Sequence, residues 1–197
     1  LTAYRNEKVY ITGGVSIDKK HITTLKDKTV SSRMDKKIRN SIRTINFNEL
    51  GIKISDLDKR GFEYATKAAW YEVFINNQPL QIARWPNNGM IKTHKVINAG
   101  NIKSKGTKGQ GDPVIEYVEN EPSTWKDSKG GWICGYFGEG WADDMLPIKS
   151  IDKKKKRITV GSSSLYGFKA DGKSRRWFIR NIPEVMDVPG EYINNAT

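Results

Sequence analysis

Cysteine and histidine are scarce in this chain. Its 197 residues include one cysteine, Cys134, and two histidines, His21 and His94. A single cysteine excludes an intrachain disulfide and any metal site built from several cysteines, and two histidines far apart in the sequence indicate no metal motif. We therefore expect no metal or other cofactor, and a buried structural role for Cys134.

Long apolar runs are also missing. No run approaches the roughly 18 residues that a membrane helix needs, so membrane insertion is not expected. The sequence begins at Leu1 without a recognisable signal peptide, and its end at Glu191–Thr197 carries no capping signal. These features predict a piece of a longer protein. Oligomeric state cannot be deduced from the sequence.

Positive charge is abundant. The formal net charge is +12 at pH 7, the pI is about 9.7, and the mean hydropathy is −0.65. This balance makes nucleic acid or an anionic polysaccharide a partner to consider. The lysines are spread along the chain, however, and the densest run, Asp152–Arg157, lies between two strand-like segments. We interpret that run as a solvated hairpin turn in preference to a nucleic-acid patch.

Short alternating segments dominate the rest of the sequence, and aromatic residues make up 10% of it, too many for a disordered chain. Gly, Asn and Asp separate strands predicted at roughly 10-residue spacing, which is typical of an antiparallel β-barrel or sandwich with little helix. The predicted strands are 8–17 (broken at Gly13-Gly14), 70–75, 80–85, 114–118, 130–137, 147–151, 157–160 and 174–182. A short helix or helical turn is predicted over Ser31–Ser41, from the helical spacing of Met34 and Ile38, and an exposed loop over Asn98–Gly111.

The stretch Ala83-Arg84-Trp85-Pro86 places a large ring where a strand meets a turn. Pro86 cannot donate to a ladder, so the ring of Trp85 is expected to fold under the turn and close one end of the barrel. Arg84 then points the other way. It becomes a candidate for an exposed contact with a carboxylated sugar or with Asp143.

Several of these strings resemble right-handed parallel β-helix carbohydrate-active proteins, a group that includes α-galactosidase-like and fucosidase-like glycosidases. The strings are VYITGG, VFINNQPLQIARWPNNG, WICGYFGEGWADDMLPIKSIDKKKKRITV and RRWFIRNIPEVMDVPGEY, and they cover most of the chain from Val9 to Tyr192. The resemblance implies that residues 1–69 open a parallel β-helix, that residues 70–182 are an inserted antiparallel β-barrel, and that residues 183–197 return toward the β-helix.

The same resemblance implies a function. The chain would be an N-terminal fragment of an exported bacterial glycoside hydrolase, located outside the cell, in the periplasm or on the cell surface, and acting on a polysaccharide or oligosaccharide. The family's catalytic carboxylic acids lie on later β-helix coils, so this segment would shape the glycan cleft without cutting. A departure lies at the end, where Ile193 and Asn194 follow Tyr192 in place of the usual aromatic residue and Asp.

The candidate glycan-binding residues lie mainly around one Gly-rich turn. Glycoside hydrolysis needs two facing carboxylates, but Asp143 and Asp144 are neighbours, and neighbours on a strand point to opposite faces. Glu139 and Asp143 have a better spacing, although a role in holding the loop is the stronger interpretation for these acids. The full candidate set is Arg84, Tyr136, Glu139, Trp141, Asp143 and Asp144.

The aromatic candidates have two readings. An exposed ring can stack on a sugar, whereas rings at alternating strand positions usually pack in a core. Core packing is favoured for Trp85 and Trp132, and Trp141 remains open between the two. Two further hypotheses for the whole chain also stay open: a basic β-barrel that binds nucleic acid or an anionic polysaccharide, and a structural insertion without a ligand.

Overall fold

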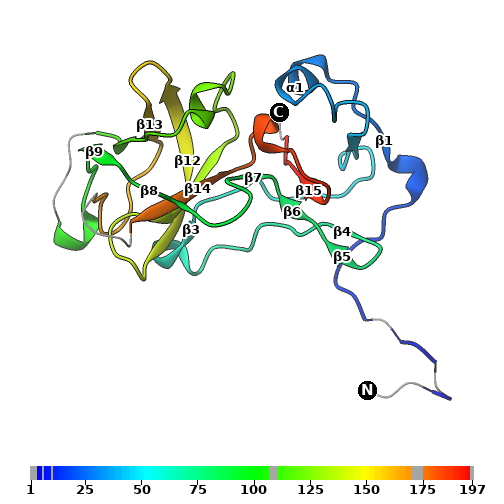
Figure 1. Cartoon of the computed structure of the whole chain (residues 1–197). Helices are drawn as coiled ribbons and strands as arrows, with labels where there is room; N and C mark the ends of the chain where they lie inside the picture. The colour runs from blue at the N-terminus through cyan, green and yellow to red at the C-terminus, as the bar shows by residue number, and fades with distance from the viewer. Residues whose placement is uncertain (1–3, 6, 10, 107–110, 170–174, 196–197) are drawn as a thin grey trace.

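A computed structural model describes residues 4–5, 7–9, 11–106, 111–169 and 175–195 of the chain. The protein is mainly β, as predicted, with a large antiparallel sheet on one side and smaller strand pairs beside the single short α-helix on the other (Figure 1). The N-terminal segment extends away from the rest of the molecule (Figure 1).

The large sheet has nine strands in the order β7-β14-β11-β12-β13-β10-β9, with β3 added to β12 and β8 added to β14. Its strands are β3 (Arg60–Gly61), β7 (Arg84–Trp85), β8 (Ile91–Lys92), β9 (Lys95–Asn98), β10 (Val114–Glu116), β11 (Trp132–Tyr136), β12 (Asp143–Asp152), β13 (Arg157–Val160) and β14 (Arg176–Arg180). Every pairing within it is antiparallel.

Strand β12 joins the two halves of this sheet. Asp143 to Pro147 pair with β11, and Ile148 to Asp152 pair with β13, with a register irregularity between Ile148 and Ser150. Irregularities of this kind bend a strand and increase its twist. Both halves therefore face one core, in which the largest fully buried side chains are Trp177, Tyr117, Phe137, Ile115, Ile133, Leu146, Ile158 and Ile179.

The opposite face of β11 and β14 is also buried. Trp132, Cys134 and Phe178 alternate with the core residues and form a second apolar cluster. Trp70 covers it, with its ring 5.1 Å from that of Trp132 and its indole N–H donating to the backbone oxygen of Asp58 at 2.8 Å. Cys134 is buried, as predicted, and this burial raises the pKa of its thiol to about 12.

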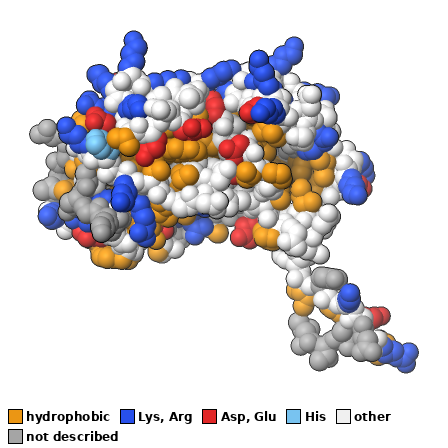
Figure 2. All heavy atoms as spheres, in the orientation of Figure 1, with side chains coloured by type: hydrophobic (Ala, Val, Ile, Leu, Met, Phe, Trp, Pro, Cys, Tyr) orange, Lys and Arg blue, Asp and Glu red, His pale blue; other side chains and the backbone are white. Residues whose placement is uncertain are grey.

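Strand β12 and strand β13 form the predicted hairpin, with the four lysines 153–156 in its turn. Lys156 adopts a positive φ and donates to the backbone oxygen of Val118 and to Asn120, both at 2.8 Å. Figure 2 shows lysine and arginine side chains scattered over the visible face, without one dominant cluster. The hairpin prediction is thus confirmed.

The segment before the large sheet forms smaller pairs. Strands β4 (Phe74–Ile75) and β5 (Gln78–Pro79) make a hairpin whose turn is Asn76-Asn77, both with positive φ, which asparagine tolerates. The predicted strand 80–85 splits, since β6 (Gln81–Ile82) leaves the large sheet and pairs in parallel with β15 (Glu191–Tyr192). Among the described residues, this is the only parallel pair.

One local prediction holds only in part, and one was wrong. The helix α1 spans Lys28–Arg33, an earlier start than predicted, because the Asp27 carboxylate caps it by accepting from two backbone N–H groups. The rest of the predicted helix or helical turn forms hydrogen-bonded turns, in which the N–H of Ile38 donates to Asp35 and that of Ser41 donates to Ile38. The chain bends at Gly13-Gly14 as expected, but the described residues on either side of it are not in strands. They find no partner strand, and Val9, Ile11 and Val15 are exposed.

The remaining elements are short. Strands β1 (Thr23–Thr24) and β2 (Arg43–Thr44) form an antiparallel pair, and the 3-10 helices are η1 (Lys19–His21), η2 (Phe62–Tyr64), η3 (Lys103–Lys105), η4 (Glu121–Ser123) and η5 (Pro183–Val185). The predicted loop Asn98–Gly111 is interrupted by η3, and residues 107–110 of that loop lie outside the described residues.

The contact between β3 and β12 yields a stability prediction. Gly61 has a φ of +117°, and a Cβ there would lie 2.2 Å from the backbone oxygen of Asp143. Gly61→Ala should lower the free energy of unfolding in urea by about 1–3 kcal/mol. Gly51→Ala is the control, because Gly51 also has a positive φ but nothing lies near its Cβ. Equal losses in both variants would contradict the close-contact argument.

Candidate functional site

An exposed aromatic surface lies at the turn between β11 and β12. Trp141 in that turn is 60% exposed, although it is one of the largest apolar side chains. Phe62 of η2 lies edge-on to it with ring centres 5.0 Å apart, and Tyr166 does so at 5.2 Å. We call these three residues the Trp141 surface. Neighbouring rings hold the indole in place while much of it stays in solvent.

Close backbone packing positions the three rings. A Cβ at Gly138 would lie 2.4 Å from the Cβ of Tyr166, so only glycine lets the 166–167 segment approach this turn. On the other side, pairing of Gly61 with Asp144 brings η2, and with it Phe62, beside the first residues of β12. The Trp141 surface is therefore assembled from three separate chain segments.

Two carboxyl groups are buried near this surface. Asp144 is 2% exposed, and its Oδ1 is a buried atom without a hydrogen-bond partner, as is Oε2 of Glu63. The other oxygen of Glu63 accepts from the ammonium of Lys103. The pKa of Asp144 is raised to about 7, chiefly by burial and also by the negative charges of Glu63 and Asp143, while hydrogen bonds from the Ser164 hydroxyl and the Glu63 backbone N–H oppose the rise.

The other acidic candidates, Glu139 and Asp143, differ from Asp144 in their burial and in their partners. Glu139 forms ion pairs with the Lys169 ammonium at 2.6 Å and with the Arg175 guanidinium at 3.7 Å. Asp143 and Asp144 alternate in burial at the start of β12, as expected of strand neighbours, so they do not face one ligand together. Loop-holding ion pairs thus account for Glu139.

Tyr136 lies on the strand face opposite the main core. It is partly exposed, and the guanidinium of Arg176 on the neighbouring strand β14 lies over its ring, 5.0 Å from the centre. This contact leaves Tyr136 beside the turn that carries Trp141, but the described contacts do not join Tyr136 to the Trp141 surface.

Arg84 differs from its prediction. It is half-buried, because its guanidinium lies 4.0 Å from the centre of the Phe178 ring and donates to the backbone oxygens of Pro86 (2.9 Å) and Gly89. Strands β14 and β11 separate it from β12, so it does not reach Asp143. Of the two partners predicted for Arg84, Asp143 is therefore wrong, and contact with a carboxylated sugar stays a prediction.

The predicted core packing of Trp85 is confirmed. Its ring packs against the main core, 5.5 Å from the ring of Trp125 and 6.3 Å from that of Trp177. Arg84 and Trp85 thus point to opposite faces of the sheet, as the strand alternation requires. The turn after Trp85 is held by the Arg84 guanidinium.

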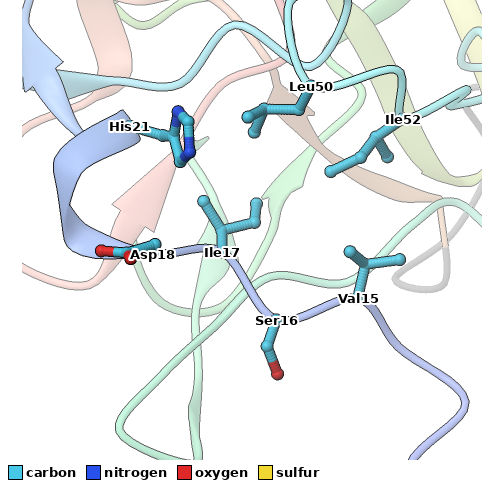
Figure 3. Close-up of a pocket in the computed structure, with 7 residues that line it drawn as sticks. All are labelled: Val15, Ser16, Ile17, Asp18, His21, Leu50 and Ile52. Atoms are coloured by element: carbon cyan, nitrogen blue, oxygen red, sulfur yellow. The ribbon is translucent and has the colours of Figure 1, made fainter.

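Two small hollows lie away from the Trp141 surface. One of about 200 Å³ is formed by the N-terminal segment, where Ile17 and His21 face Leu50 while Ser16 points away (Figure 3). Another, of about 260 Å³, lies beside Trp125 and Ser150. Both are smaller than the roughly 300–1,000 Å³ of typical ligand pockets. Neither of these two hollows includes a residue of the Trp141 surface.

Several residues of these sites were not predicted from the sequence. Phe62, Glu63 and Tyr166 carry no motif, and they reach their neighbours only through close approaches between distant segments. Gly61 before Phe62 and Gly138 before Glu139 were the available signals, since glycines mark close backbone approaches.

Asp144 gives a prediction about pH. Its folded-state pKa of about 7 exceeds its ordinary value of 3.8, so between these values the folded protein binds more protons than the unfolded chain. The free energy of unfolding should then fall as pH rises from about 4 to 7, by at most about 1.4 kcal/mol per pH unit. In urea unfolding, Asp144→Asn should show no such decrease in the free energy of unfolding between pH 4 and 7, whereas Asp143→Asn should show it as the wild type does. An unchanged pH profile in Asp144→Asn would refute the assignment.

Within the described residues, no group of three or more His, Cys, Asp or Glu side chains could hold a metal ion, and no helix has the length and apolar character to cross a membrane. The aromatic and acidic side chains around Trp141 are the clearest candidate site. Comparison of the chain with models of protein families, with curated proteins and with solved structures finds no match. What this site binds is therefore inferred from its own chemistry.

Proposed function

We propose that this chain is the N-terminal part of an exported carbohydrate-active parallel β-helix protein, a glycoside hydrolase, and that its antiparallel sheet presents the Trp141 surface to a glycan. In this proposal the segment shapes the binding cleft and the catalytic acids lie elsewhere in the protein. The observation that carries it is the exposure of Trp141, which is 60% accessible while two other rings hold it edge-on.

A supported, exposed indole suits the apolar face of a sugar ring. Aromatic rings supply a large contact area with little conformational entropy to lose, and fixing them beforehand lowers the cost of binding. Phe62 is itself 46% exposed, so the apolar surface continues beyond Trp141.

The parallel pair of β6 and β15 supports the β-helix part of the proposal. Gln81–Ile82 precede all of the large sheet except β3, and Glu191–Tyr192 follow it, yet the two segments pair in parallel. A sheet inserted between two parallel coils would produce this arrangement if most of the insertion begins after Ile82, later than the residue 70 that the resemblance implies. Parallel pairing otherwise requires a long crossover, and here the crossover is the large sheet itself.

Stacking on Trp141 predicts a loss of glycan affinity on truncation. Trp141→Ala should weaken binding by about tenfold on a glycan array and by calorimetry with the best ligand, and Trp141→Phe should retain part of it. Phe74→Ala is the control, because Phe74 is also exposed but lies on the β4-β5 hairpin.

The two other hypotheses give different outcomes. Steep loss of oligonucleotide binding between low and moderate salt, without a glycan signal, would identify a nucleic-acid protein. A Trp141→Ala variant that changes stability but no binding would identify a structural insertion. Turnover of aryl glycosides by this chain alone would contradict the claim that the catalytic acids lie elsewhere.

A further inference from the structure

Two arginines oppose each other on the face of the large sheet that lies opposite the main core. Arg84 of β7 and Arg180 of β14 are directly paired in the antiparallel register. Their guanidinium carbons lie 4.0 and 4.8 Å from the centre of one ring, that of Phe178. Like charges directly opposite on paired strands destabilise a sheet. A pair of cations held over one aromatic ring therefore needs a compensating interaction.

The described residues leave much of this pair unsatisfied. Arg84 uses two of its N–H groups on the turn carbonyls of Pro86 and Gly89, which fixes the plane of its guanidinium. The side chain of Arg180 makes no hydrogen bond or ion pair within the described part of the chain, and its Nε is a buried atom without a partner. A buried N–H without an acceptor costs free energy.

The Glu191 carboxylate, whose charge acts on Arg84, does not compensate the two positive charges. Glu191 accepts from the backbone N–H groups of Arg84, Asp187 and Val188 at 3.1–3.3 Å, so its oxygens hold the return segment. Burial lowers the pKa of the Arg84 guanidinium, and the charge of Arg180 lowers it further, against the opposing effect of Glu191. The field of the pair is thus incompletely neutralised.

We propose that Arg84, Arg180 and Phe178 form a binding site for the carboxylate of an acidic sugar. A guanidinium whose plane is fixed matches the two oxygens of a carboxylate, and the second arginine adds charge. The choice of a sugar rests on the proposed function. It is favoured over nucleic acid because Phe178 is only 6% exposed and offers no face for a base to stack on.

The test is an array of uronate-containing oligosaccharides and their carboxyl-reduced counterparts, followed by calorimetry with the best ligand. The wild-type chain should bind a uronate oligosaccharide, and Arg180→Gln should weaken that binding at least tenfold. Arg180→Lys keeps the positive charge but not the planar guanidinium, so its affinity for the uronate oligosaccharide should lie between those of the wild type and Arg180→Gln. Arg43→Gln removes the same charge from β2 and should bind as wild type. Thermal unfolding checks that each variant is folded.

Four outcomes would overturn the proposal: no uronate binding, equal binding of the reduced glycans, wild-type affinity in Arg180→Gln, or tighter binding of sulfated glycans or oligonucleotides that Arg180→Gln abolishes. Trp141→Ala measured on the same array separates the two proposals. A Trp141 effect without an Arg180 effect leaves the glycan function standing and removes only the carboxylate site.

Discussion

Both candidate sites depend on the position of β11 between β12 and β14. Its five residues pair on both sides without a break, so one strand fixes the register of the sheet's centre. Both of its faces are buried, Ile133 toward the main core and Trp132 with Cys134 under Trp70. A one-residue slip would exchange these faces and place the wrong side chains in each cluster. Correct register is therefore a condition for every surface contact described above.

The two sites lie toward opposite ends of this strand. Trp132 pairs with Arg180 at one end, and Tyr136, at the other, leads into the turn that carries Trp141. Four residue steps of about 3.3 Å separate these ends, which is on the order of 13 Å. A glycan that contacts both sites must therefore be an oligosaccharide, with an acidic residue some distance from the residue stacked on Trp141.

The strands of the large sheet could be predicted from the sequence because each depends on local alternation. β10, β11, β13 and β14 lie within their predicted segments, and the Asn76-Asn77 turn follows from the φ values that asparagine tolerates. The apolar spacing of Met34 and Ile38 predicts a later helix, whereas the Asp27 cap starts α1 at Lys28. The N-terminal segment alternates as a strand does, but alternation cannot supply a partner strand.

The sites themselves were predicted only in part, and the reason is physical. Trp141 and Asp144 could be named because they lie in one short string, whereas Phe62 and Tyr166 come together with Trp141 through close approaches at Gly61 and Gly138. Arg84 shows the opposite failure. Its direction off the strand could be predicted from alternation, but whether it meets solvent or a ring depends on Phe178, almost a hundred positions later in the chain. In the folded chain Arg84 pairs with Arg180, so two positive charges lie over one ring. Two opposed cations indicate an anionic ligand more strongly than one arginine does.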